Sequence, residues 1–350
     1  MAVTSSGVQW DSQALLAAII NIPPAPVFFT RRLFSIEATT RSNLVGIDTL
    51  NGEAKLSPFV GKRKKGIAIQ RPKVRASLFE PPRLAPVLPF SADELYNRQP
   101  GYSQFDVDAA ARAEGDATAR DLSLLSLMNA RRIEFMTAQC LSTGLITCTD
   151  DDDNRLVAEI DYRPINTFVP TVLWSAAATC KPLDDLRAMM RLVNASGYAA
   201  SLVVFGSKAA DAWEASTQVQ NAMSTYHNLS VQLSPEQMRE NDEFGVTMLG
   251  SYRGLPLFVS EAVFTQKDGT SAPYWPENLV LVAATGLQSQ VAFCGIAQVA
   301  DDEGSMSVIE GANVPQLYYE AGSDSRSLRL SSRPVPIPSN LNTWCTGNVL

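Results

Sequence analysis

The sequence has little of the chemistry that enzymes draw on. Its 350 residues include one histidine, His227, so any serine–histidine–aspartate or cysteine–histidine arrangement would have to use that residue. No G-x-S-x-G turn accompanies it, and neither the G-x-x-x-x-G-K-[ST] nor the G-x-G-x-x-G phosphate-binding motif is present. His227 follows an expected helix, where simple exposure or the negative end of the helix dipole accounts for it. The sequence therefore predicts a protein that is not an enzyme and needs no cofactor.

Cysteine is also sparse, and its spacing argues against two common roles. The cysteines are Cys140, Cys148, Cys180, Cys294 and Cys345. They are scattered, odd in number and never arranged as C-x-x-C, so neither a disulfide framework nor a zinc site is indicated. We expect reduced, structural thiols in a reducing cytoplasm.

Long apolar runs are absent as well. The stretch 14–20 is too short for a signal peptide and lacks a basic leader. No run approaches the roughly 18 apolar residues that cross a bilayer. With 45% hydrophobic and 19% charged residues, the composition is that of a globular protein. We therefore expect a soluble, intracellular protein that makes no contact with a membrane.

The charge that is present is distributed unevenly. The net charge is −7 and the pI is about 5.0, which disfavours a general nucleic-acid binder. Residues 55–90 nevertheless carry nine basic residues against one acid, Glu80, a net charge of +8 that leaves −15 on the rest of the chain. One chain thus combines a positive arm with a negative body.

The positive arm is also rich in proline. Residues 58–100 hold seven of the 21 prolines, with two β-like pieces, 66–70 and 74–79, on either side of Pro72. These pieces predict a two-stranded ribbon with Pro72 at an edge or a bulge. Because an isolated two-stranded hairpin is marginal in water, the ribbon must lie on another surface. Residues 28–34 follow further prolines and are expected to be an extended arm as well.

The next segment predicts one long helix and an acidic hairpin. Apolar residues recur at helical spacing over 117–143, with a break expected at Gly115 and a stop at Gly144. Strands are expected at 145–149 and 156–162, around a turn that holds four consecutive aspartates, Asp150 to Asp153. That turn is either a solvated hairpin tip or a ligand for a hard cation such as calcium.

The remainder of the chain alternates helices and strands, which predicts the α+β class. We expect helices at 183–193 and at 209–226, the second capped by Ser207. Strands are expected at 201–205, 255–259, 262–265, 278–283, 292–299 and 327–338, with a turn at 267–269.

The order of these elements resembles that of the phage lambda-type major head protein family, which has the Hong Kong 97 capsid fold. The resemblance covers nearly the whole chain. It rests on the aromatic and basic run 28–34 with 56–60, the segment 80–86, the long helix with its hairpin, the step from 194–197 to 202–205, and the segment 276–281.

The resemblance implies a division of the chain into five parts. Residues 1–54 would be an N-terminal arm and 55–101 an extended β-ribbon, the extension loop. Residues 102–178 would be a peripheral domain with a long spine helix and a hairpin. Residues 179–300 would form a mixed axial domain, and 301–350 the return strands of the peripheral domain.

The resemblance also implies a function and partners. Copies of the chain would form the hexamers and pentamers of the icosahedral head of a tailed bacteriophage. Assembly would take place in the host cytoplasm, and the head would enclose double-stranded DNA without sequence-specific binding. No long scaffolding segment precedes the arm, so a separate scaffold is implied, together with a portal and a decoration or cement protein. The alternatives are an encapsulin-like cargo compartment on the same fold and an enzyme on an unrecognised α+β fold.

We predict that the positive arm contacts neighbouring subunits, because the +8 arm and the −15 body are complementary surfaces on identical copies. A nucleic-acid patch, a nuclear signal, a solvated loop and a lysine crosslink are the other interpretations. The predicted contact residues are Lys62, Arg63, Lys64, Lys65, Arg71, Lys73, Arg75 and Arg83.

Neutralising the basic cluster tests this prediction. Replacing Lys62, Arg63, Lys64 and Lys65 with glutamine should leave the circular dichroism of the monomer unchanged and slow shell formation, because only a contact between copies is lost. If the monomer unfolds instead, the segment belongs to the core and the assignment fails.

Overall fold

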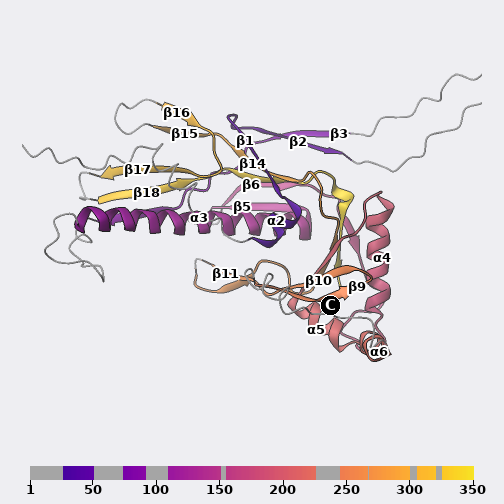
Figure 1. Cartoon of the computed structure of the whole chain (residues 1–350). Helices are drawn as coiled ribbons and strands as arrows, with labels where there is room; N and C mark the ends of the chain where they lie inside the picture. Colours follow the sequence, from indigo (N-terminus) through magenta and orange to yellow (C-terminus); the bar gives the residue numbers. More distant parts are fainter. Residues whose placement is uncertain are drawn as a thin grey trace, which may run out of the picture.

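The computed structural model describes residues 27–50, 74–91, 109–150, 155–225, 245–266, 268–299, 306–320 and 325–350. Helices and sheets are both present, as the α+β prediction requires. Figure 1 shows one long helix, α3, lying beneath several layers of strands. A second group, which holds α4, α5, α6, β9 and β10, lies at one end of that layer, and the C-terminus is marked there. The described chain is therefore organised around one helix and two groups of strands.

Helix α3 spans Ala109–Thr143, 35 residues or about 50 Å at the usual rise of about 1.5 Å per residue. It contains the predicted helix 117–143 and extends it by two turns at the N-terminal end. The break expected at Gly115 was wrong, because Gly115 lies inside the helix. A glycine costs only about 1 kcal/mol in a helix interior, and alanines at 109–111 favour continuation. The helix buries Leu122 and Leu125 against Leu317, Leu328 and Leu330.

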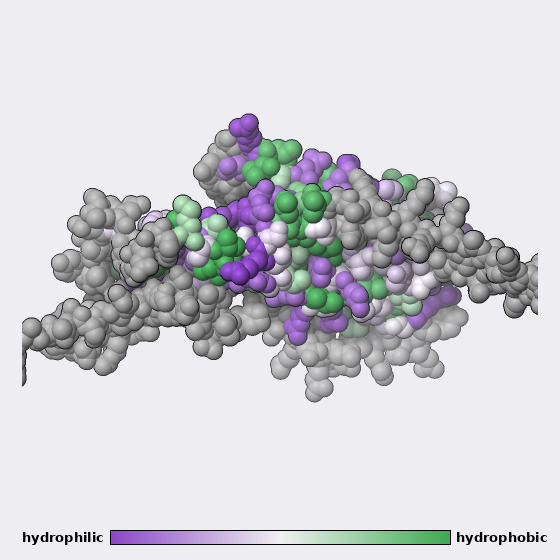
Figure 2. Space-filling model, turned by 90° about the horizontal axis from the view of Figure 1, so that it is seen from above, coloured by the Kyte–Doolittle hydropathy of each residue, from purple (hydrophilic) through white to green (hydrophobic). Residues whose placement is uncertain are grey.

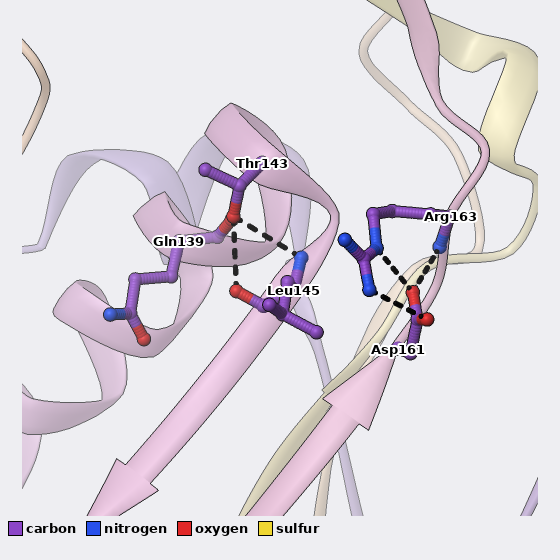
Figure 3. A network of polar contacts seen from close by, with 5 residues as sticks. All are labelled: Gln139, Thr143, Leu145, Asp161 and Arg163. Carbon is purple, nitrogen blue, oxygen red and sulfur yellow. Dashed lines mark hydrogen bonds and ion pairs between the residues drawn. The ribbon is translucent and has the colours of Figure 1, made fainter.

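The predicted stop and hairpin after α3 are confirmed. Gly144 adopts a positive φ of 69°, and the chain turns back as β5 (Leu145–Thr149) and β6 (Leu156–Asp161). Figure 3 shows the turn: the Thr143 hydroxyl donates to the carbonyl of Leu145 at 3.0 Å and accepts from the Leu145 amide at 3.2 Å. The glycine carbonyl accepts from the Tyr162 amide at 2.8 Å. Only glycine combines this backbone with the close packing on this side of the turn.

An exposed ion pair follows the hairpin. Asp161 accepts hydrogen bonds from both the backbone amide and the guanidinium of Arg163, each at 2.9 Å (Figure 3). The pair is half-exposed and contributes little to stability by itself. The chain then continues to β7 (Asn166–Phe168).

The second group is built on a six-stranded mixed sheet with the order β7-β20-β13-β8-β10-β9. Strand β8 (Leu202–Gly206) is buried along its whole length at the centre. Its neighbours are β13 (Leu279–Ala283) and β10 (Leu255–Ser260), and β9 (Val246–Tyr252) pairs with β10 at the edge of the sheet. The last strand, β20 (Trp344–Asn348), pairs with β13 and β7. The end of the chain thus lies in the same sheet as β13 and β8, and the division of the chain into five parts stays a prediction.

Three helices accompany this sheet. Helix α4 (Pro182–Ala195) confirms the prediction for 183–193. The single helix expected at 209–226 was wrong: the structure has α5 (Ser207–Ala215) and α6 (Thr217–Thr225). Ser216 is extended between them, and its hydroxyl accepts from the amide of Val219 at 3.4 Å. This N-cap starts a new helix. The expected cap at Ser207 is also wrong, because Gly206 occupies the N-cap position.

The layers above α3 are small sheets. One has the order β1-β14-β19 and another β17-β18-β4, in which β4 spans Val87–Ser91. The expected strand 292–299 is divided at Gly295, where an added Cβ would lie 2.5 Å from the Arg41 carbonyl oxygen. The strands are β1 (Ile36–Thr40), β14 (Gln290–Cys294), β15 (Ile296–Val299), β16 (Met306–Ile309), β17 (Val314–Glu320), β18 (Ser325–Ser331) and β19 (Pro334–Ile337). β11 (Val263–Thr265) and β12 (Ser271–Pro273) form a separate hairpin. No described helix is long and apolar enough to cross a membrane.

A pair of glycine substitutions tests the turn after α3. Gly286 has a φ of 75° and open space around its Cα, whereas a Cβ on Gly144 would lie 2.8 Å from Ile165 Cγ2. Gly286→Ala should lower the free energy of unfolding by about 1–2 kcal/mol, the cost of the left-handed backbone. Gly144→Ala should cost about 1–3 kcal/mol more because of overpacking. Urea denaturation of the subunit measures both, and equal losses would contradict the tight turn.

Candidate subunit-contact surfaces

The first described segment is a helix that a distant carboxylate caps. Helix α2 spans Phe28–Leu33, and no side chain at its N-cap, Val27, satisfies its first amides. Glu134 of α3 does so: its Oε1 accepts from the Phe29 amide at 2.6 Å, and its Oε2 accepts from the Thr30 amide at 3.0 Å. The Thr30 hydroxyl donates to the same Oε2 at 2.7 Å. The carboxylate also complements the positive end of the helix. The extended arm expected at 28–34 was therefore wrong.

This contact is buried and surrounded by aromatic rings. Glu134 is 6% exposed, and burial raises the pKa of its carboxyl against the opposing effect of the hydrogen bonds from Thr30 and Phe29. The Phe29 ring stacks on Trp275 with centroids 5.1 Å apart, and Phe28 meets Phe258 edge-on at 5.2 Å. Because an unpaired buried amide or carboxylate is costly, α2 and α3 are held as one unit.

Beyond α2 the chain runs along the edge of the body and then leaves it. Strand β1 pairs in parallel with β14, from Ile36 opposite Gln290 to Thr40 opposite Cys294. Strand β2 (Val45–Leu50) then pairs with β3 (Val74–Phe79), and Leu50 lies opposite Val74. The segment 51–73, which holds seven basic residues, thus begins and ends at adjacent backbone positions. Strand β3 pairs with β2, while its expected partner, 66–70, lies outside the described residues.

The chain returns to the body through a second set of contacts. Glu80 pairs with Arg333 at 3.3 Å. Leu84 exchanges two backbone hydrogen bonds with Ser332, at 2.8 and 2.9 Å. Strand β4 (Val87–Ser91) then pairs with β18. The described chain before and after residues 51–73 is therefore paired with the strands above α3, through β1 with β14 and through β4 with β18.

The structure places few of the predicted contact side chains. Lys62, Arg63, Lys64, Lys65, Arg71 and Lys73 lie outside the described residues. Arg75 lies in β3, where its backbone pairs with Thr49. Arg83 has a described side chain, and its Nε and Nη2 donate to the Ser331 hydroxyl at 3.2 and 2.6 Å. Contact of this set with a neighbouring subunit stays a prediction.

The other sequence candidates supply little chemistry. The Asp150 amide donates to the Arg155 carbonyl at 2.8 Å and closes the acidic hairpin. Residues 151–153 and His227 lie outside the described part of the chain. Among the residues that the structure describes, no three histidines, cysteines or carboxylates come together as a metal site.

Exposed apolar side chains mark surfaces that sequence reasoning missed. Met306 is 86% exposed and Val308 43% exposed on β16, and Val169 is 78% exposed after β7. Figure 2 shows apolar residues gathered in separate patches among polar ones on the upper face. Grouped exposed apolar residues are typical of protein–protein contacts. The short strands around them show no regular alternation of apolar and polar residues. The sequence alone therefore did not indicate which face of these strands is exposed to water.

Comparison with known proteins shows the family to which the chain belongs. Residues 11–349 match the sequence profile of the phage major capsid protein E family. The chain belongs to this family. No curated protein sequence is significantly similar to it.

Two solved structures support the fold of this major capsid protein. A protein described as a prophage capsid protein of E. coli CFT073 has a TM-score of 0.69 at 16% sequence identity, over 97% of this chain and 99% of the other. A phage-related protein from Bordetella bronchiseptica RB50 has a TM-score of 0.52 at 12% identity, over 96% of each chain. The Hong Kong 97-like capsid fold and the capsid function predicted from the sequence are confirmed.

Substitutions at Glu134 test the cap on α2. Glu134→Ala leaves the Phe29 amide buried without a partner and should lower the free energy of unfolding by about 2–4 kcal/mol. It should also speed tryptic cleavage after Arg31 and Arg32 in α2. Thr30→Val removes one hydroxyl donor and should cost about 1 kcal/mol. Unchanged denaturation and cleavage in Glu134→Ala would show that the carboxylate does not hold the helix.

Proposed function

We propose that this major capsid protein closes into the hexamers and pentamers of a tailed-phage head by extending its basic segment onto neighbouring copies. The observation that supports this most directly is the pairing of Leu50 with Val74 at the end of the β2–β3 hairpin. The 23 residues between these two strands hold seven basic side chains and one acid, and the paired ends of β2 and β3 are the root from which this segment starts and to which it returns.

The physical reason is charge complementarity between copies. The chain outside residues 55–90 carries a net charge of −15, so each neighbour offers an acidic surface to the basic segment. Such complementarity steers encounters and fixes register more than it adds affinity. Contacts between different surfaces of identical subunits close into rings, as hexamers and pentamers require.

The proposed role implies partners and requires no catalytic site. The expected partners are a scaffold, a portal and a decoration or cement protein, and the shell is expected to assemble in the host cytoplasm. It encloses double-stranded DNA that the acidic body does not grip in a sequence-specific way. The subunit acts by binding its own copies, so no residue is assigned a catalytic role.

Electron microscopy of the expressed protein, with and without its scaffold, tests this function. Closed shells with sixfold and fivefold clusters are expected, and genome-filled particles should form in infected cells. Particles that hold cargo proteins in place of DNA would favour the encapsulin-like alternative. Discrete monomers under every ionic condition, with turnover of a substrate, would contradict the proposal.

A further inference from the structure

Three arginines line up where the extension loop returns to the body. Arg329, Ser331 and Arg333 alternate along an extended stretch that continues β18, so their side chains share one face, roughly 7 Å apart. Leu328 and Leu330 point to the opposite face and are buried against α3. The backbone beyond β18 stays extended because Ser332 pairs with Leu84.

Arg83 fills the gap in this row from another strand. Its guanidinium donates twice to the hydroxyl of Ser331, which lies between Arg329 and Arg333. Burial, followed by the positive charges of Arg329 and Arg333, lowers the pKa of Arg83. Three guanidinium groups therefore form one positive row, and the middle one rests on a neutral oxygen.

The row lacks matching negative charge within the described residues. Glu80 pairs with Arg333 at 3.3 Å, at one end. At the other end, Arg329 donates to the amide oxygen of Gln316 and lies over the ring of Tyr318 at 5.6 Å. The Nε atoms of Arg329 and Arg333 are buried without an acceptor. Holding three partly buried guanidinium groups together costs free energy, because Glu80 is the one carboxylate that pairs with them among the described residues.

We propose that the row of Arg83, Arg329 and Arg333 docks an acidic segment of a second copy of the chain through guanidinium–carboxylate hydrogen bonds. This inference rests on the proposed assembly function and names a partner for the root of the extension loop. Guanidinium groups bind carboxylates in a bidentate manner, which adds geometric specificity to charge.

The charge of the chain itself favours a protein carboxylate over a nucleic-acid phosphate. The chain outside 55–90 carries an excess of acidic groups, and a shell brings many copies of it together. The occupant is therefore expected to come from the neighbouring subunit.

A zero-length crosslink identifies the occupant. The Arg83→Lys variant keeps the charge and places an amine at the centre of the row, where a carbodiimide joins it to any carboxylate in contact. Shells assembled from mixed ¹⁵N-labelled and unlabelled variant subunits should give mixed-isotope crosslinks between position 83 and an acidic residue. The Lys208–Glu277 pair, 2.5 Å apart, is the intrachain control. Shells in which position 83 links only to Glu80 of its own chain, or to nothing, would overturn the proposal.

Assembly kinetics supply an independent measurement. Arg83→Gln should slow shell formation about tenfold at low salt, because charge contacts mainly change association rates. The exposed Lys181 provides the control variant, Lys181→Gln, with the same charge change, which should assemble like the wild type. A 30-bp DNA duplex is the competing probe: if Arg83→Gln weakens its binding and leaves assembly unchanged, nucleic acid is the occupant and the proposal fails. Failure of the wild type to form shells would instead overturn the proposed function.

Discussion

The contact between Glu134 and the start of α2 holds the described architecture together. A carboxylate on the longest helix satisfies the amides of a helix 105 residues earlier in the chain, inside an aromatic cluster. Because the partners are buried, separating them would leave both the carboxylate and the amides without hydrogen bonds. Helices α2 and α3 therefore behave as one body, and β1 starts from a fixed point on it.

The position of the basic segment follows from this anchor. Strand β1 leads from α2 along β14 to the β2–β3 hairpin, and β4 fixes the returning chain on β18. In the proposed assembly, the segment between β2 and β3 contacts a neighbour while the paired strands β1 and β4 stay on their own subunit. The arginine row beside the return strand places further positive charge at the same root. In the proposed assembly, the positive segment of one copy thus contacts the negative body of the next.

The sequence predicted the parts of this structure that depend on local patterns. The helix that ends at Thr143 and the hairpin after Gly144 were found because periodicity and a glycine stop are local signals. Helix α2 was missed because it is one and a half turns long, follows prolines and takes its cap from Glu134. The break at Ser216 depends on a single side-chain cap, and the place of β20 in the six-stranded sheet depends on tertiary pairing. The composition of the sequence located the basic arm. The contact between Arg83 and Ser331 could not be predicted, because the two residues are brought together only by the fold.

Hydrogen exchange on the isolated subunit tests the central claim, that the root of the loop is formed before assembly. The amides of Phe29 and Thr30 should be protected as strongly as those of β14, because Glu134 and the aromatic cluster already hold α2. The amides of β1 that face β14 should be protected with them. Exchange of α2 and β1 at the rate of unstructured peptide, with protection gained only in the shell, would contradict the claim.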